Sequence, residues 1–342
     1  MTGLGRRFGK PALVLLGAAL IASYPWLVPN SYLVYAGVLT MMFAGLATSW
    51  NLVGGFTGYV SLGHSAFFGL GAYGTGLLIT RAGWPWVLSI VAAGLGVGVF
   101  AVIVGIAAMR VRGASFVIVS IALVAAVNLL AQGWRSLTGG SVGLRVPTQY
   151  GELTRLEAHY LFFYLFMGLL ALTLLTWWFM DRSRFGTGLK AIREDEDKAE
   201  SLGVPTAGFK VVAFALSALF VAFGGGLYAV WFRNLDPIFV FSILIGSYMV
   251  LMSLLGGVRY LFGPLLGAAI VAPAGEFFLL RLGETQIHLT VMGLLLGVVV
   301  LFMPEGIIPA VAKLFGLRRP PAASIREDTA EQRATLEEAA VQ

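Results

Sequence analysis

Residues 188–229 read GLKAIREDEDKAESLGVPTAGFKVVAFALSALFVAFGGGLYA and change from strongly charged to almost uniformly apolar soon after Pro205. The second half has the composition of a membrane helix, which needs about 20 mainly apolar residues to cross a bilayer. The first half belongs to segment 184–205, in which nine of 22 residues are charged. This contrast predicts a helical membrane protein with one compact, water-exposed segment between two spans.

The composition of the whole chain supports this interpretation. Of its 342 residues, 58% are hydrophobic and only 12% are charged, whereas a soluble domain has about 25% charged residues. The absence of cysteine excludes disulfides and thiol chemistry. The net charge of +6 indicates anchoring at a membrane face rather than binding to nucleic acid. The apolar runs do not alternate, which excludes a membrane β-barrel.

We therefore expect an all-α polytopic membrane protein with about ten transmembrane helices. The candidate spans are 11–28, 31–53, 58–80, 86–109, 114–134, 158–180, 210–232, 237–257, 262–281 and 287–304. Glycine or proline in 58–80 and 262–281 could bend these segments or make them re-entrant, so eight or nine full spans remain an alternative. The basic N-terminus resembles a signal peptide, but its long apolar run favours a retained first helix.

The distribution of lysine and arginine predicts the orientation. With ten spans and the N-terminus inside, 17 of the 23 basic residues lie in the cytoplasm. The six on the outside are Arg81, Arg135, Arg145, Arg155, Arg233 and Arg281. This bias follows the positive-inside rule and places both termini in the cytoplasm. We expect a transmembrane domain over 1–317, an extracytoplasmic loop at 135–157, a cytoplasmic loop at 181–209 and a polar cytoplasmic tail at 318–342.

The charged cytoplasmic segment is predicted to form one helix over 188–202. Thr187 is its expected N-cap, and Gly203 is placed to end it in the left-handed conformation. Its apolar residues, Leu189, Ile192, Ala199 and Leu202, are expected to share a face. The alternative is a solvated connector. A defined helix with an apolar face instead favours a rigid element that transmits a displacement from a second protein.

Five motifs resemble those of branched-chain amino acid ABC-transporter permeases, and their pattern is most similar to the M-type subunit. They are GYVSLGHSAFFGLGAYGTGLL at 58–78, RGASFVIVSIALVAAVNLL at 112–130 with LTGGSVGL at 137–144, the segment 188–229, LLGGVRYLFGPLLGAAI at 254–270 and GLLLGVVVLFMPEGI at 293–307. They occur in the family's order and span residues 31 to 310.

The resemblance implies an ABC-importer permease fold in the bacterial inner membrane. It implies import of branched-chain or related amino acids with a second homologous permease, two cytoplasmic ATPases and an extracytoplasmic solute-binding protein. The chain itself would not be an enzyme and would bind no cofactor, with ATP and Mg used by the ATPases. The sequence agrees, because it contains no G-x-x-x-x-G-K-[ST] phosphate loop. Urea, amides or small carboxylates are alternative substrates.

Two sets of residues are candidates for function. The ATPase-coupling set is Gly188, Leu189, Ile192, Arg193, Glu194, Asp195, Ala199 and Gly203. Within this set, Arg193, Glu194 and Asp195 are expected either to contact the ATPase or to brace the helix that does. The translocation-path set is Ser61, Gly63, His64, Thr138, Gly139, Gly140 and Glu276.

Each path candidate has a structural alternative. His64 could be an interhelical hydrogen-bond partner, Thr138–Gly140 could be a tight turn, and Glu276 could reach outward or pair with Arg281. Among other function classes, an ion-coupled carrier needs intramembrane ionisable groups, and this chain offers few beyond His64 and Glu276. A membrane enzyme needs a reactive constellation, and the sequence has no catalytic triad, carboxylate pair or metal-ligand cluster.

Overall fold

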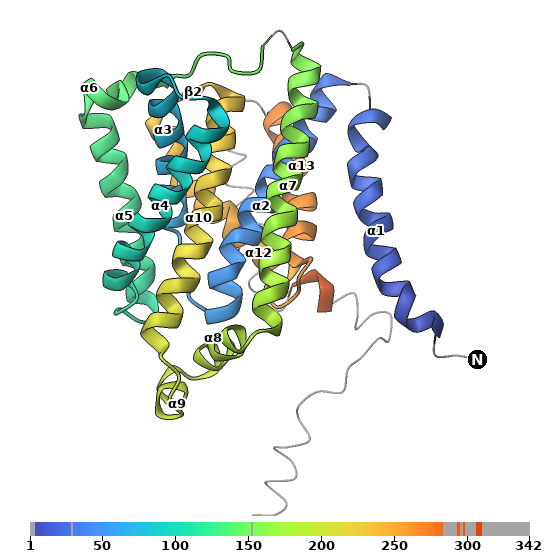
Figure 1. Cartoon of the computed structure of the whole chain (residues 1–342), viewed down its shortest axis with the longest axis vertical. Helices are drawn as coiled ribbons and strands as arrows, with labels where there is room; N and C mark the ends of the chain where they lie inside the picture. The colour runs from blue at the N-terminus through green and yellow to red at the C-terminus, as the bar shows by residue number, and fades with distance from the viewer. Residues whose placement is uncertain are drawn as a thin grey trace, which may run out of the picture.

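The computed structural model describes residues 4–28, 30–151 and 153–282, with a few isolated positions between 293 and 309. These residues form a bundle of long, roughly parallel helices, with two short helices, α8 and α9, below one end (Figure 1). The elements are α1 (Leu4–Leu27), α2 (Ser31–Thr57), α3 (His64–Ala82), α4 (Trp86–Ala108), α5 (Ala114–Gly133), α6 (Arg135–Thr138), η1 (Gly140–Val142), β1 (Leu144–Arg145), α7 (Arg155–Arg182), α8 (Arg184–Glu194), α9 (Glu196–Ser201), α10 (Thr206–Phe232), β2 (Asn234–Leu235), α11 (Pro237–Val240), α12 (Ile243–Gly256) and α13 (Gly263–Leu282).

The expected all-α polytopic membrane fold matches this architecture. Six segments are long and apolar enough to cross a membrane, namely α2, α4, α5, α7, α10 and the stretch Pro237–Gly256. Shorter apolar stretches occur in α1 and α13. The described residues therefore do not confirm the predicted count of ten spans. The predicted span 287–304 and the tail 318–342 lie outside the described residues.

Two predicted spans are interrupted in the structure. Within 58–80, the helix begins only at His64, because Gly58 ends α2 in the left-handed conformation and residues 58–63 are not helical. Within 237–257, the helix is interrupted between α11 and α12, and Ser242 is the N-cap of α12. The other segment that was expected to be bent or re-entrant, 262–281, forms one helix that contains Pro273.

The centre of the bundle is formed by α2 and α10, which are the most buried of the long apolar helices. Helix α10 packs against α2, α3, α4 and α7. By contrast, only 22% of the apolar stretch of α5 is buried, and this helix lies at the edge of the bundle (Figure 1). A surface as apolar as the outward side of α5 suits contact with lipid or with another membrane chain.

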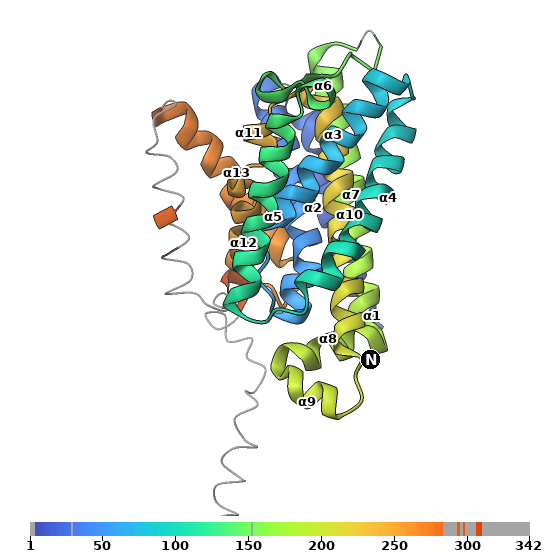
Figure 2. The same cartoon turned by 90° about the vertical axis from the view of Figure 1, so that its left-hand side faces the viewer.

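The two short strands join the ends of distant segments. Strand β1 pairs with β2 in antiparallel register, with Leu144 opposite Leu235. This pairing fixes the loop between α5 and α7 over the end of α10, at the end of the bundle opposite α8 and α9 (Figures 1 and 2).

Glycines allow α3 and α10 to approach closely. A Cβ at Gly71 would lie 2.2 Å from the backbone oxygen of Ala222, and one at Gly225 would lie 2.0 Å from that of Phe68. Association of helices in lipid depends on such packing, because lipid tails are as apolar as the side chains themselves. The Gly224–Gly226 run therefore allows α10 to pack closely against its neighbours.

We expect Gly225→Val to lower the free energy of unfolding by about 1–3 kcal/mol, because an overpacked contact with backbone cannot relax by side-chain movement. The matched control is Gly96→Val in α4, where a Cβ would meet nothing within 4 Å. Thermal unfolding in mild detergent measures both. Equal melting temperatures for the two variants would contradict the close α3–α10 contact.

Candidate functional site

The short helices α8 and α9 fold back tightly against the ends of the long helices. The Ser183 hydroxyl caps α8 by accepting from the Gly186 amide at 3.0 Å. A Cβ at Gly186 would lie 1.8 Å from the Met180 oxygen, and one at Gly188 would lie 2.6 Å from the Phe209 ring. Only glycine fits at these two positions, so α8 is held directly against α7 and α10.

The prediction of one helix over 188–202 is wrong. The chain forms two helices that are separated at Asp195, which has an extended backbone (φ −163°, ψ 109°). The Asp195 carboxylate accepts a hydrogen bond from the Lys198 amide at 3.0 Å and caps α9. Aspartate is favoured at the N-cap of a helix and less favoured in a helix interior. The N-cap of α8 is Ser183 rather than Thr187. Gly203 follows α9 in the left-handed conformation (φ +85°), as predicted.

The predicted apolar face is only partly formed. Leu189, Ile192 and Ala199 are buried against the bundle, as is Gly188, whereas Leu202 is 84% exposed. Four members of the predicted coupling set therefore face the chain's own helices. They hold the α8–α9 unit in place and offer no surface to a second protein.

The three charged residues that were expected to contact the ATPase, or to brace the helix that does, have different surroundings. Arg193 Nη1 donates to the Gly55 oxygen in the last turn of α2 at 2.7 Å. Burial lowers the pKa of the Arg193 guanidinium, and the nearby positive charge of Arg259 lowers it further. Asp195 caps α9, whereas the Glu194 side chain is 68% exposed. Arg193 and Asp195 thus brace the two helices, and Glu194 faces outward.

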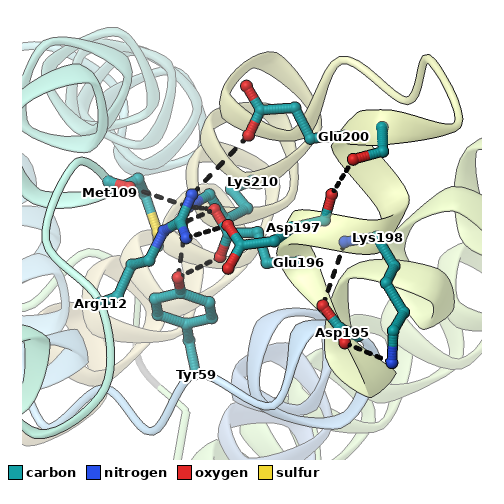
Figure 3. A network of polar contacts seen from close by, with 10 residues as sticks. Tyr59, Met109, Arg112, Asp195, Glu196, Asp197, Lys198, Glu200 and Lys210 are labelled. Carbon is teal, nitrogen blue, oxygen red and sulfur yellow. Dashed lines mark hydrogen bonds and ion pairs between the residues drawn. The ribbon is translucent and has the colours of Figure 1, made fainter.

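A buried ion pair fastens α9 to the start of α10 (Figure 3). Lys210 Nζ lies 2.6 Å from Glu196 Oε1, and the two side chains are 3% and 11% exposed. Lys210 also donates to the Met109 oxygen at 2.9 Å, after the end of α4. The Tyr59 hydroxyl donates to Glu196 Oε2 at 2.5 Å. One lysine and one glutamate therefore join four parts of the chain.

Arg112 extends this network at the protein surface. It contacts Glu196, Asp197 and Glu200 of α9 at 3.3, 2.5 and 3.7 Å. Burial by itself would raise the pKa of the Glu196 carboxyl. The hydrogen bonds from Lys210 and Tyr59 and the two nearby positive charges outweigh it, so the pKa is lowered below its ordinary value of 4.5. Glu196 is thereby held in its charged form.

Sequence reasoning missed this network. Neither Tyr59, Arg112 nor Lys210 was a candidate, and Glu196 was treated only as part of the charge run. The available signal was Lys210, a charged residue at the start of an otherwise apolar span, since such a residue needs a partner. That partner is Glu196, 14 residues earlier in the chain, whereas Tyr59 and Arg112 reach Glu196 from segments far away in sequence.

The first group of path candidates lies deep inside the bundle. Ser61, Gly63 and His64 are buried. His64 Nε2 lies 2.8 Å from Ser217 Oγ, and Ser217 in turn donates to the Ser49 oxygen at 2.7 Å. Because Ser217 has a single hydrogen, His64 must donate through Nε2. The described geometry thus matches the interhelical hydrogen-bond alternative for His64.

The non-helical residues before α3 are held from three sides. Trp50 Nε1 donates to the Ser61 oxygen at 2.7 Å, and the Leu62 amide donates to Ser120 Oγ at 3.1 Å. A Cβ at Gly63 would lie 3.1 Å from the Ser120 oxygen. Segment 58–63 therefore runs from the Tyr59–Glu196 contact to the buried His64, linking α9 to the beginning of α3.

The second group, Thr138–Gly140, forms a tight turn at the opposite end of the bundle. The Thr138 hydroxyl lies 2.5 Å from the Ala131 oxygen, and the Gly140 amide donates back to that hydroxyl at 3.2 Å. The Gly139 amide donates to the Arg135 oxygen. The amides of Gly139 and Gly140 are therefore both occupied within the turn.

Glu276 lies on α13, beside Tyr32 and Tyr35 of α2. Both Glu276 and Arg281 are described, and no ion pair joins them; Arg281 lies over the Phe277 ring instead. The structure therefore brings Ser61, Gly63 and His64 together, but it leaves Thr138–Gly140 and Glu276 at separate places.

The arrangement defines a class of protein. A bundle of apolar helices carries a short helical unit that is fixed to several helix ends, with no phosphate-binding loop in the sequence. Such a unit can transmit movement to the membrane helices. This organisation suits a membrane transport protein.

The comparisons with known proteins identify the family. Residues 31–302 match the model described as "Branched-chain amino acid transport system / permease component". The chain therefore belongs to this family of multi-pass membrane permeases, as the resemblance predicted. It is 26% identical to the high-affinity branched-chain amino acid transport system permease protein LivM of Escherichia coli strain K12, over 88% of this chain and 75% of the relative.

A second relative agrees. The LivM permease protein of Salmonella typhimurium strain LT2 is also 26% identical, with the same coverage of both chains. No solved structure matches this chain.

Lys210→Met tests the buried ion pair. We expect it to lower the free energy of unfolding by about 3–5 kcal/mol, because removing one member of a buried pair leaves the other uncompensated. The control is Lys198→Met, since Lys198 is 83% exposed and an exposed pair contributes at most about 1 kcal/mol.

The pH dependence gives a second test of the same pair. The folded-state pKa of Glu196 is lowered, so its stabilisation is complete above the ordinary value of 4.5 and is lost as the pH falls below it. The stability difference between wild type and Lys210→Met should therefore be constant at neutral pH and shrink in acid. Denaturant unfolding in detergent measures the free energy of unfolding of each variant. The buried ion pair would be contradicted if, at neutral pH, Lys210→Met destabilised the protein no more than Lys198→Met does.

Proposed function

We propose that this chain is a membrane-spanning permease subunit of an ATP-driven importer for branched-chain or related amino acids. Family membership supports the transport role, and the names of both relatives, which state branched-chain amino acid transport, support the substrate class. The excess of lysine and arginine on one side supports an orientation with α8, α9 and both termini in the cytoplasm. The membrane is then the bacterial inner membrane.

The proposed assembly contains a second homologous permease, two cytoplasmic ATPases and an extracytoplasmic solute-binding protein. The chain hydrolyses no ATP and needs no cofactor of its own, and ATP and Mg are used by the ATPases. The bound solute is delivered at the end of the bundle that carries the 135–157 loop. It crosses along a path between the two permeases.

The observation that carries the proposal is the α8–α9 unit. It projects from the bundle in both views (Figures 1 and 2), and its contacts with the bundle are short and numerous. A rigid element transmits a displacement because its ion pairs and packed residues have few alternative arrangements. Pressure from an ATPase on this unit therefore reaches the ends of several membrane helices together.

The exposed end of α9 is the proposed contact with the ATPase. Asp197, Lys198 and Glu200 present charges there, and Leu202 presents an apolar side chain that is 84% exposed. A single exposed apolar residue surrounded by charges suits the centre of a small docking contact, where burial stabilises and charges orient. We therefore assign the contact with the ATPase to the end of α9 and to Glu194. Leu189 and Ile192 are buried and are not part of this contact.

Displacement of α9 has three routes into the membrane. The Glu196–Lys210 pair leads to α10, Arg112 leads to the connection between α4 and α5, and Tyr59 leads to segment 58–63 before α3. In α8, Arg193 leads to the last turn of α2. The central helices α2 and α10 therefore receive the movement directly, which suits a change of access along a path beside them.

Leu202→Glu tests the contact with the ATPase. We expect the variant to fold and reach the membrane, because the side chain touches water, but to lose most ATP-dependent amino-acid uptake and to retain less ATPase in affinity purification. The measurements are uptake into membrane vesicles and mass spectrometry of the co-purified subunits.

Val142→Glu is the matched control, since Val142 is 90% exposed at the opposite end of the bundle. It should keep the ATPase bound. Normal uptake by Leu202→Glu would contradict the α9 contact, and purification of the wild-type chain without any ATPase would contradict the ATP-driven importer.

A further inference from the structure

A cavity of about 840 Å³ opens at the end of the bundle opposite α8 and α9. It lies between the start of α2, the start of α7, the end of α10 and the loop before α7. None of the residues predicted for the translocation path lines it. The cavity is large enough for a small organic solute, since ligand pockets commonly measure about 300–1,000 Å³.

Aromatic rings form one wall of this cavity. The ring centroids of Tyr35 and Trp231 lie 5.4 Å apart, and His159 lies 5.8 Å from Tyr35 and 6.2 Å from Trp231. Three rings from three different helices, α2, α7 and α10, thus form one surface. Such a surface accommodates an aliphatic side chain, and its ring faces also attract a cation.

Two arginines supply positive charge to the same cavity. Arg155 and Arg233 both line it, and no aspartate or glutamate is among its described lining residues. Arg155 is exposed, and in the described part of the chain it has no ion pair. A guanidinium binds a carboxylate with two parallel hydrogen bonds, which gives both affinity and orientation.

The backbone at Arg233 is held in an unusual conformation. Among the described residues it is the one non-glycine with positive φ, at 65°. The Arg233 oxygen accepts from the Val146 amide at 2.7 Å, and its guanidinium donates to Thr148 Oγ1 at 2.6 Å. The loop before α7 therefore fixes the guanidinium at the mouth of the cavity, and strained positions of this kind concentrate at functional sites.

A carboxyl group lies near the aromatic wall. Glu276 of α13 is close to Tyr32 and Tyr35, and both tyrosines line the cavity. His159 also keeps a buried Nδ1 without a hydrogen-bond partner in the described part of the structure. The described lining of the cavity thus combines two cationic groups with an aromatic wall.

We propose that this cavity binds a free aliphatic amino acid on its way from the extracytoplasmic side to the translocation path. Its carboxylate pairs with Arg155 and Arg233, and its side chain packs on the Tyr35–Trp231 wall. Its ammonium group lies over the ring faces on the side of Glu276. The inference rests on the proposed function, and it places solute selection in this chain as well as in the binding protein.

The alternative for these rings and arginines is an interfacial belt that anchors the helices at the membrane surface. An interfacial belt would have no preference for a carboxylate solute. A binding site would prefer L-leucine and 4-methylpentanoate, which carry the carboxylate, over 3-methylbutan-1-amine, which lacks it.

The experiment uses the complex of the two permeases and the ATPases in lipid nanodiscs, without the solute-binding protein and without ATP, and measures binding of radiolabelled L-leucine. We expect saturable binding in which 4-methylpentanoate competes and 3-methylbutan-1-amine competes at least tenfold less well. The double variant Arg155→Gln/Arg233→Gln should lose at least tenfold in leucine affinity. Arg81→Gln is the control, since Arg81 lies at the same end and contacts the Ser136 oxygen outside the cavity.

The outcomes separate the two proposals. Leucine binding by the double variant equal to that of Arg81→Gln, or no saturable binding by wild type at millimolar leucine, would overturn the cavity site. ATP-dependent uptake by wild-type complex in vesicles, measured in parallel, tests the proposed function by itself. If the complex with both arginines replaced takes up leucine normally, the proposed importer function stands and the proposed cavity site is overturned.

Discussion

The structure at the α8–α9 end depends on how one buried ammonium group is neutralised. Lys210 stands at the start of an apolar helix and is 3% exposed, so water cannot solvate it. It is neutralised by Glu196, and Glu196 in turn accepts the Tyr59 hydroxyl and contacts Arg112. An isolated buried charge is very costly, so these groups move as one unit or separate at a large free-energy cost. That constraint ties a helix outside the bundle to the helices inside it.

The same constraint explains why the non-helical segment 58–63 can exist within the bundle. Backbone without helical hydrogen bonds is tolerated at membrane depth only where protein groups satisfy it. Here the Trp50 indole, the Ser120 hydroxyl and the Tyr59–Glu196 contact hold the segment. Broken helices of this kind are common in transporters. In the proposed mechanism, the break before α3 is the place at which a membrane helix responds to a displacement of α9.

Specificity and energy transfer occupy opposite ends of the molecule in the proposed mechanism. The arginine and aromatic cavity lies above the ends of α2 and α10, and the α8–α9 unit contacts the other ends of the same two helices. Helices α2 and α10 are also the most buried of the long apolar helices, and glycines such as Gly225 allow α10 to pack closely against its neighbours. A displacement at one end of so tightly packed a pair reaches the other end because side chains have little room to absorb it.

The sequence by itself determined the membrane class, the positions of most long helices and the family, because these depend on local apolar length and on ordered motifs. It also located the charged segment and the left-handed Gly203. It failed at one local choice and at contacts between different helices. Asp195 divides the predicted helix because its carboxylate caps α9, and Leu202 faces water because α9 turns away from the buried face of α8. His64 meets Ser217, and Lys210 meets Glu196, only after the helices that carry them have packed together. Only the tertiary structure decided those pairings, because hydrophobic periodicity places a residue on a helix face but does not specify which polar group lies opposite it.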